Sequence, residues 1–216
     1  MSLPGEHEFR TVDSREVYSG AIVALRVDRV AMPGGREADR EIVEHHGAVA
    51  VAVLDDDERL VLIRQYRHAL GRRLWELPAG LLDEPGEAPL VAARRELAEE
   101  TGLAADRWSL LVDVALSPGF TDESVRVFLA EGLRDVGRPA AHDEEADLEI
   151  ARVPLADAVV MALRGEIVNA TAVSGILALA AARSGGVVLR PTEAPWPDRP
   201  EMFSRRKRNR TGTGRT

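Results

Sequence analysis

Three glutamates within a short stretch, Glu96, Glu99 and Glu100, have the spacing best suited to chemistry in this chain. The segment from Pro89 to Thr101 contains no glycine and consists mainly of Ala, Leu, Arg and Glu, which favour an α-helix. Spacings of three and four residues bring side chains to one face of a helix, so the carboxylates should lie close together and repel one another. A divalent cation such as Mg2+, which prefers oxygen ligands, would offset that repulsion. We therefore predict a metal site here rather than a solvated acidic face.

Signals at both ends of the segment define the predicted helix. Pro89 suits a first helical turn, where its missing N–H costs nothing, and Gly102 suits the left-handed position just after a helix. The apolar side chains opposite the glutamates predict a buried stripe made of Leu90, Val91, Leu97 and Ala98.

Basic side chains precede this helix. Arg64 and Arg67 lead into the segment Leu74–Gly80, which runs toward the helix. A guanidinium group forms paired hydrogen bonds with phosphate or carboxylate, so both arginines are candidates for binding an anionic ligand. The alternative is that they are solvated surface residues at an exposed strand end and bind no ligand.

The elements around the helix indicate an α+β fold. Two apolar runs flank the turn at residues 55–58 and predict a hairpin. Further strands and then two helices follow the glutamate helix, an order that favours an α/β/α sandwich around a mixed sheet. The hairpin strands are expected at 48–54 and 59–66, the later strands at 108–116, 125–131 and 148–153, and the helices at 154–164 and 170–183.

The chain divides into three predicted parts. Residues 1–46 suggest a small antiparallel β-unit, too small to bury its own apolar side chains. Residues 47–190 should form the main domain. Residues 191–216, which contain four prolines and then a run of basic residues, are expected to remain an unpacked tail.

Composition excludes several classes of protein. The chain of 216 residues has a net charge of −8 and no cysteine, which excludes disulfides and thiolate metal sites and suits a cytoplasmic location. Its longest apolar runs are too short to span a bilayer, so no membrane partner is expected. The basic tail has no aromatic residue after Phe203 for base stacking, so no specific nucleic-acid partner is expected either.

The residues of the predicted helix resemble the signature of a known family. Gly80, then Glu87, then the nine residues from Arg95 to Leu103 match the Nudix box, G-x5-E-x7-R-E-U-x-E-E-x-G-U, where U is aliphatic. The one departure is that six residues, not five, separate Gly80 from Glu87. The resemblance covers about residues 40–185 and implies the Nudix α/β/α sandwich.

The resemblance also implies a reaction, the metal-dependent hydrolysis of a nucleoside diphosphate linked to another group. The family's metal ligands fall on Glu96, Glu100 and the backbone carbonyl of Ala79, with Glu99 in a supporting catalytic or additional-metal role. Mg2+ is the expected ion and Mn2+ the alternative. Attack by an activated water fits a chain that offers carboxylates and no cysteine nucleophile.

Other features are similar to those of the ADP-ribose pyrophosphatase subfamily. Pro118 lies sixteen residues after Gly102, the approximate position of a proline that marks this subfamily. The acidic loop at 142–147 resembles the one that supplies the general base, so Glu144 is the expected base and Glu145 the alternative. The N-terminal β-unit resembles one exchanged across a homodimer, and Tyr18 within it is a candidate for stacking on adenine.

Three functions remain open at this point. The leading hypothesis is hydrolysis of ADP-ribose to AMP and ribose 5-phosphate. A related alternative is a Nudix enzyme for another nucleoside-diphosphate sugar, such as GDP-mannose. A different class is a non-catalytic sensor that binds ADP-ribose; the complete set of helix glutamates argues against it, because a pure binder does not need them all.

Overall fold

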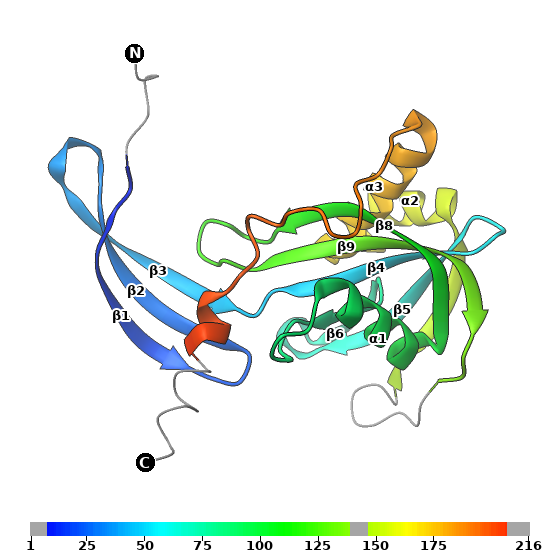
Figure 1. Ribbon diagram of the computed structural model, residues 1–216, viewed down its shortest axis with the longest axis horizontal. Helices are drawn as coiled ribbons and strands as arrows, with labels where there is room; N and C mark the ends of the chain where they lie inside the picture. The colour runs from blue at the N-terminus through cyan, green and yellow to red at the C-terminus, as the bar shows by residue number, and fades with distance from the viewer. Residues whose placement is uncertain (1–7, 139–146, 207–216) are drawn as a thin grey trace. The chain divides into compact units, whose positions relative to one another are not determined.

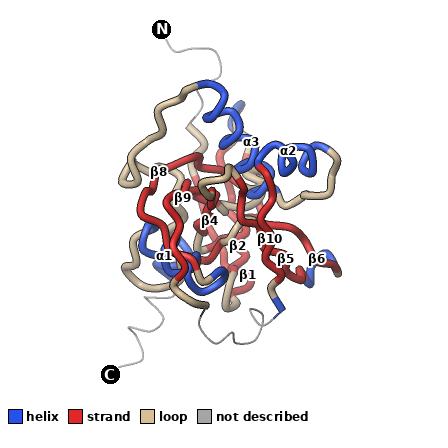
Figure 2. Tube along the Cα trace, turned by 90° about the vertical axis from the view of Figure 1, so that its right-hand side faces the viewer, coloured by secondary structure: helices blue, strands red, loops and turns tan. Residues whose placement is uncertain are grey.

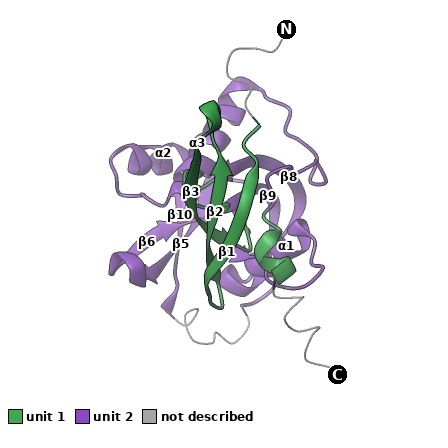
Figure 3. Ribbon diagram, turned by 90° about the vertical axis from the view of Figure 1, so that its left-hand side faces the viewer, with its two compact units in different colours: residues 1–47, 115–123, 200–216 green, residues 48–114, 124–199 purple. Residues whose placement is uncertain are grey.

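The computed structural model describes residues 8–138 and 147–206, which form two compact units (Figures 1 and 3). We call them the small unit, from residues 1–47, 115–123 and 200–216, and the large unit, from residues 48–114 and 124–199. Each unit therefore combines segments that are far apart in the chain.

The large unit is built on a mixed sheet of seven strands within the described residues. The order is β10-β5-β4-β9-β8, with β6 paired to β5 and β7 paired to β4; β4 and β9 run parallel, whereas β4 is antiparallel to β5. The predicted hairpin is confirmed as β4 and β5. The strands are β4 Ala48–Leu54, β5 Arg59–Arg67, β6 Arg72–Glu76, β7 Ala79–Leu81, β8 Leu103–Ala115, β9 Ser124–Asp135 and β10 Glu149–Pro154.

Helices cover both faces of this sheet, with α1 on one side and α2 and α3 on the other (Figure 2). Their bounds are α1 Pro89–Thr101, α2 Leu155–Leu163 and α3 Ala170–Gly185. The predicted α/β/α sandwich is therefore confirmed. Within the described ranges, none of the helices has both the length and the apolar character needed to cross a membrane.

Helix α1 begins and ends where the sequence predicts, but its buried face differs from the predicted stripe. Ala92, Ala93 and Leu97 are fully buried against the valines of β4, whereas Val91 is 54% exposed, so the prediction for Val91 is wrong. The buried face also includes the carboxylate Glu100. The prediction is confirmed for Leu97, but the buried face is shifted from the predicted stripe because a charged residue occupies part of it.

The small unit contains a three-stranded antiparallel sheet in the order β1-β2-β3. The strands are β1 Thr11–Ser19, β2 Val23–Ala31 and β3 Glu37–His45. The loop at 115–123 joins this unit through Asp122, whose carboxylate accepts a hydrogen bond of 2.9 Å from the backbone N–H of His45. A small antiparallel N-terminal sheet is therefore present as expected.

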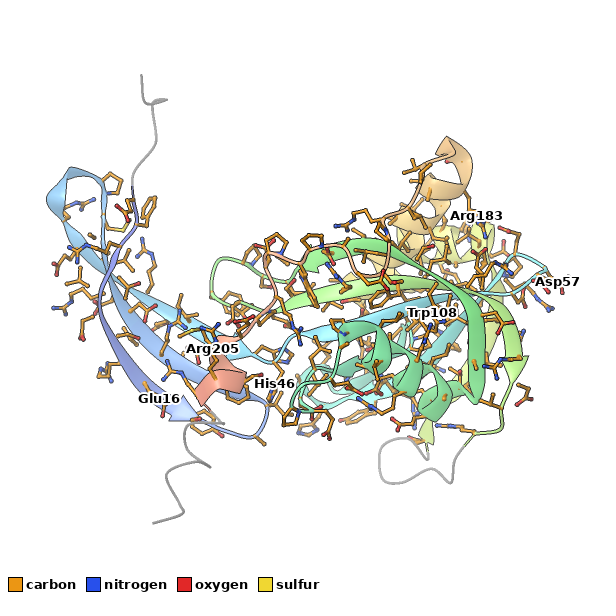
Figure 4. All side chains as sticks on the ribbon, in the orientation of Figure 1. Glu16, His46, Asp57, Trp108, Arg183 and Arg205 are labelled. Atoms are coloured by element: carbon orange, nitrogen blue, oxygen red, sulfur yellow. The ribbon has the colours of Figure 1, made fainter. Side chains whose placement is uncertain are left out.

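The C-terminal segment is packed in the small unit as far as residue 206. Phe203 is fully buried and its ring meets the ring of His46 edge-on at 4.5 Å between centroids. Arg206 donates to the buried carboxylate of Glu44, with Nε to Oε2 at 2.7 Å, and also to Glu16. Figure 4 shows Glu16 and His46 beside the short helical turn that carries Arg205.

Residues 191–199 also make specific contacts, within the large unit. The Trp196 indole N–H donates to the Ser124 hydroxyl at 3.1 Å, and the Arg126 guanidinium lies 4.7 Å from the centre of the Trp196 ring. The prediction of an unpacked tail is therefore wrong for residues 191–206. Composition could not reveal this packing, since one buried aromatic ring and two ion pairs are enough to anchor a segment rich in proline and charge.

Candidate active site

Arg95 joins three glutamates in the loop and helix that the sequence singled out. It forms two hydrogen bonds with Glu87, both at 3.1 Å, and Nη1 donates to Glu96 at 2.7 Å and to Glu99 at 3.0 Å. The hydrogen bond to Glu87, opposed by burial, raises the pKa of Arg95, so the guanidinium is charged. The extra residue before Glu87 therefore does not prevent it from joining the group.

Gly80 is the residue that lets Glu96 pack against the preceding strand, β7. An ideal Cβ atom at position 80 would lie only 2.0 Å from both Cδ and Oε1 of Glu96, so a side chain there would displace the Glu96 carboxylate. Burial raises the pKa of Glu96, although the charge of Arg95 opposes the shift. The absence of a side chain at residue 80 thus leaves room for the carboxylate in this position.

Glu100 is the most buried of the four glutamates, with 7% of its surface exposed. Its Oε2 accepts a hydrogen bond of 2.9 Å from the backbone N–H of Ala79. Burial raises its pKa to about 8, and the charge of Glu96 adds to the shift, whereas the Ala79 hydrogen bond and the charge of Arg67 oppose it. A buried carboxylate with a raised pKa, beside a second carboxylate, is a place where a cation would be stabilised.

The donor set around α1 suits a hard divalent cation. Its side-chain donors are carboxylate oxygens, and the backbone of Ala79 lies beside Glu100. As they stand, the described residues include no group of three or more His, Cys, Asp or Glu side chains arranged around a common ion position. Here Arg95 supplies the positive charge for Glu96 and Glu99. The residue types therefore fit a divalent ion, while the carboxylates are oriented toward an arginine.

The two candidate arginines of β5 lie on opposite faces of the sheet. Side chains alternate along a strand, so Arg67 points to the same face as Val61, which packs with residues of α1. Arg64 points to the other face, where its guanidinium lies 5.6 Å from the centre of the Trp75 ring and pairs with Glu149 at 3.2 Å. Of these two arginines, the structure brings Arg67 to the side of the α1 carboxylates.

Glu76 is a site residue that the sequence did not single out. It lies on β6, is 2% exposed, and accepts two hydrogen bonds from Arg67, from Nε at 2.9 Å and from Nη2 at 2.6 Å. Its charge acts on Glu100. The signal available in the sequence was an acidic residue within the otherwise apolar segment that leads to Gly80.

Four predicted residues are not part of the described large unit. Tyr18, on β1, and Pro118, in the loop at 115–123, belong to the small unit, and both are exposed. Glu144 and Glu145, the predicted bases, lie outside the described residues.

Two models of known protein families together match residues 9–173. The model of the NUDIX domain matches residues 44–173, and the model described as the nucleoside diphosphate sugar hydrolase N-terminal domain matches residues 9–43. Their common boundary falls near the end of β3, close to where the small unit gives way to the large unit.

Individual relatives agree with these matches. An ADP-ribose pyrophosphatase of Mycobacterium tuberculosis is 54% identical over 205 residues, which cover 95% of this chain and 99% of that protein. An ADP-ribose pyrophosphatase of Bacillus subtilis is 39% identical, over 76% of this chain and 88% of that protein. The crystal structure of an ADP compounds hydrolase superposes with a TM-score of 0.72 at 23% identity, over 84% of this chain and 98% of that one. This last similarity is one of fold.

Proposed function

The chain belongs to the Nudix family, and we propose that it hydrolyses the diphosphate of ADP-ribose to AMP and ribose 5-phosphate. The observation that carries the proposal is a pair of carboxylates beside β7: the partly buried Glu96 lies against Gly80, and the buried Glu100 accepts a hydrogen bond from the Ala79 backbone. The 54% identity to an ADP-ribose pyrophosphatase along almost the whole chain supports ADP-ribose as the substrate.

Nudix hydrolases in general depend on a divalent metal ion, and Mg2+ is the ion we propose, with Mn2+ as the alternative. Glu96, Glu100 and the Ala79 carbonyl would hold it, and Glu99 would support them or hold a further ion. When bound, such an ion neutralises phosphate oxygens and lowers the pKa of a coordinated water.

The side chains of the protein then have separate tasks. Arg95 holds Glu87, Glu96 and Glu99 in one group, so their mutual repulsion is offset before substrate arrives. Arg67 binds a phosphate oxygen of the substrate through its guanidinium. Glu144, or Glu145 as the alternative, accepts the proton of the attacking water.

Residues of the small unit are proposed to recognise the rest of the substrate. Tyr18, which is 59% exposed, stacks on adenine, and the loop that contains Pro118 contributes to substrate binding. We further propose that residues 9–46 pair with a second copy of the chain in a homodimer.

The direct test is hydrolysis of ADP-ribose by the purified protein with Mg2+, followed by chromatographic identification of both products. AMP and ribose 5-phosphate should appear in equal amounts, and the reaction should stop when the metal is chelated. In water labelled with 18O, one labelled oxygen should enter one of the two product phosphates for each bond cleaved.

The same assay separates the alternatives. GDP-mannose and other nucleoside-diphosphate sugars, supplied at equal concentration, should be cleaved with lower kcat/KM than ADP-ribose. A higher kcat/KM for another sugar would contradict the substrate assignment but not the reaction. Tight binding of ADP-ribose without cleavage would identify a sensor instead of an enzyme.

A further inference from the structure

Glu76 is a buried carboxylate, and the reaction proposed above assigns it no role. Its side chain is 3% exposed and forms a two-bond pair with Arg67, and Gln65 adds a hydrogen bond to Oε2 at 3.4 Å. A buried carboxylate is costly to leave unpaired, so the guanidinium and the carboxylate hold each other in place. Paired hydrogen bonds of this kind fix the plane of a guanidinium as well as its position.

Strand register explains why this pair faces helix α1. Glu76 on β6 lies directly opposite Ile63 on β5, and directly opposed residues of antiparallel strands point to the same face. Side chains alternate between the two faces along β5, so Val61, Ile63, Gln65 and Arg67 all point to the same face. On this face Val61 packs with Ala92 and Leu97 of α1. The charges of both Arg67 and Glu76 act on Glu100.

The exposure of the two partners differs sharply. The Arg67 side chain is 43% exposed, whereas that of Glu76 is 3% exposed. The pair therefore consists of a buried anchor and a cation that reaches the surface of the α1 side. An arginine side chain loses much rotamer freedom when it binds a ligand, and an anchor that restricts it beforehand reduces that cost.

We propose that Glu76 is a positioning residue that orients the Arg67 guanidinium to bind the diphosphate of the substrate. The inference rests on the proposed function, because it takes a diphosphate as the ligand of Arg67. Arg64 has no equivalent role, since it lies on the opposite face with Trp75 and Glu149.

A double-mutant cycle tests the proposal. Glu76→Gln, Arg67→Ala and the double variant are compared with wild type in ADP-ribose hydrolysis with Mg2+. Glu76→Gln should lower kcat/KM about tenfold or more, mainly through a higher KM, because a displaced guanidinium binds phosphate poorly. The double variant should be no worse than Arg67→Ala, because Glu76 acts through Arg67. Losses that multiply in the double variant, or a loss below about twofold for Glu76→Gln, would overturn the proposal.

Asp113→Asn provides a matched control for structural damage. Asp113 forms the same two-bond pair with a buried arginine of the large unit, Arg126, at 2.8 and 3.1 Å. Asp113 also accepts a hydrogen bond of 3.0 Å from Arg190. Asp113→Asn should lower the melting temperature and leave kcat/KM unchanged. If it reduced kcat/KM as much as Glu76→Gln does at an equal loss of melting temperature, the effect of Glu76 would be structural.

A binding measurement distinguishes failure of this inference from failure of the proposed function. The Kd for ADP-ribose is determined by calorimetry with EDTA present, so that no hydrolysis occurs. Glu76→Gln should weaken binding about tenfold, and the cycle should again be non-additive. Wild-type protein that binds ADP-ribose but never cleaves it would overturn the proposed reaction, and the Kd values would then decide the role of Glu76. Wild-type protein that neither binds nor cleaves it would overturn both.

Discussion

At the scale of single residues, the carboxylates of α1 differ in how their charge is balanced. Glu96 and Glu99 share the guanidinium of Arg95, whereas Glu100 is buried and accepts a hydrogen bond from a neutral backbone N–H. The charge of Glu100 is therefore the least compensated of the three. A bound cation would be stabilised most by this residue.

Glu100→Gln should fold normally and lose turnover by about 100-fold or more. The amide keeps the shape of the side chain and can still accept the Ala79 hydrogen bond, but it lacks the charge that holds a cation. The measurement is kcat across a titration with Mg2+, together with the melting temperature in EDTA. Activity near the wild-type value at saturating Mg2+ would remove Glu100 from the metal site.

Glu144→Gln should lower kcat by roughly 10²–10⁴-fold, the usual effect of losing a general base. KM and the apparent affinity for Mg2+ should change little, because the side chain acts mainly in the transition state. Glu145→Gln is the control. If Glu145→Gln is inactive and Glu144→Gln is active, the base is Glu145; if both remain active, the base lies outside this loop.

At the scale of elements, buried charges fix the ends of strands and the C-terminal segment. Asp55 begins the hairpin turn between β4 and β5: Oδ1 accepts from the Arg59 backbone N–H at 2.9 Å, and Oδ2 accepts from Arg152 of β10 at 3.0 Å. One carboxylate thus ties the turn to a third strand.

The Asp55 contacts predict a loss of stability in acid. Burial alone would raise the pKa of Asp55, but the hydrogen bonds from Arg59 and Arg152 outweigh it and hold the pKa below its ordinary value. The carboxylate therefore stabilises the fold above the ordinary pKa of aspartate, and this contribution is lost as the pH falls through the lowered pKa. Asp55→Asn should cost about 1–2 kcal/mol at pH 7, since both arginines are partly exposed, and the cost should shrink toward pH 3.

Chemical denaturation of wild type and Asp55→Asn between pH 7 and pH 3 measures this difference. Asp56→Asn, an exposed neighbour in the same turn, is the matched control and should be neutral throughout. A difference between wild type and Asp55→Asn that stayed constant with pH would show that the Asp55 charge does not contribute.

Phe203→Ala should destabilise the protein by about 3–5 kcal/mol, because it removes a fully buried ring that packs against His46. Met202→Ala is the control, since Met202 is 45% exposed and should cost less than about 1 kcal/mol. Urea unfolding of both variants is the measurement. Equal stability of the two variants would contradict the packing of this segment.

At the scale of the whole molecule, the small unit leaves apolar side chains exposed along its sheet. Val12, Val17 and Tyr18 on β1 are 42%, 48% and 59% exposed. A three-stranded sheet of this size gains stability when another surface covers it. A second copy of the chain is the partner we propose.

Light scattering should therefore give twice the 23.5 kDa mass of the chain. Val17→Glu should weaken association, because it places a charge on the exposed strand, whereas Glu37→Gln on β3 should leave the mass unchanged. A mass of one chain at micromolar concentration would contradict the dimer.

The sequence by itself determined the features that depend on neighbouring residues. The bounds of α1 and the strand Ala48–Leu54 were predicted correctly, and Glu96, Glu99 and Glu100 lie on this one helix as expected. They follow from helix propensity, from proline and glycine at the helix ends, and from the three- and four-residue spacing of a helical face. These interactions act within a few residues along the chain.

Only the tertiary structure decided which distant groups meet. Strand register brought Glu76 to the face of the sheet where it pairs with Arg67, and it put Arg64 on the opposite face. Packing buried Glu100 and Phe203 and joined Arg206 to Glu44, 162 positions away along the chain. Sequence patterns cannot specify such pairs, because the free energy of a buried charge or ring depends on the atoms that surround it in the folded chain.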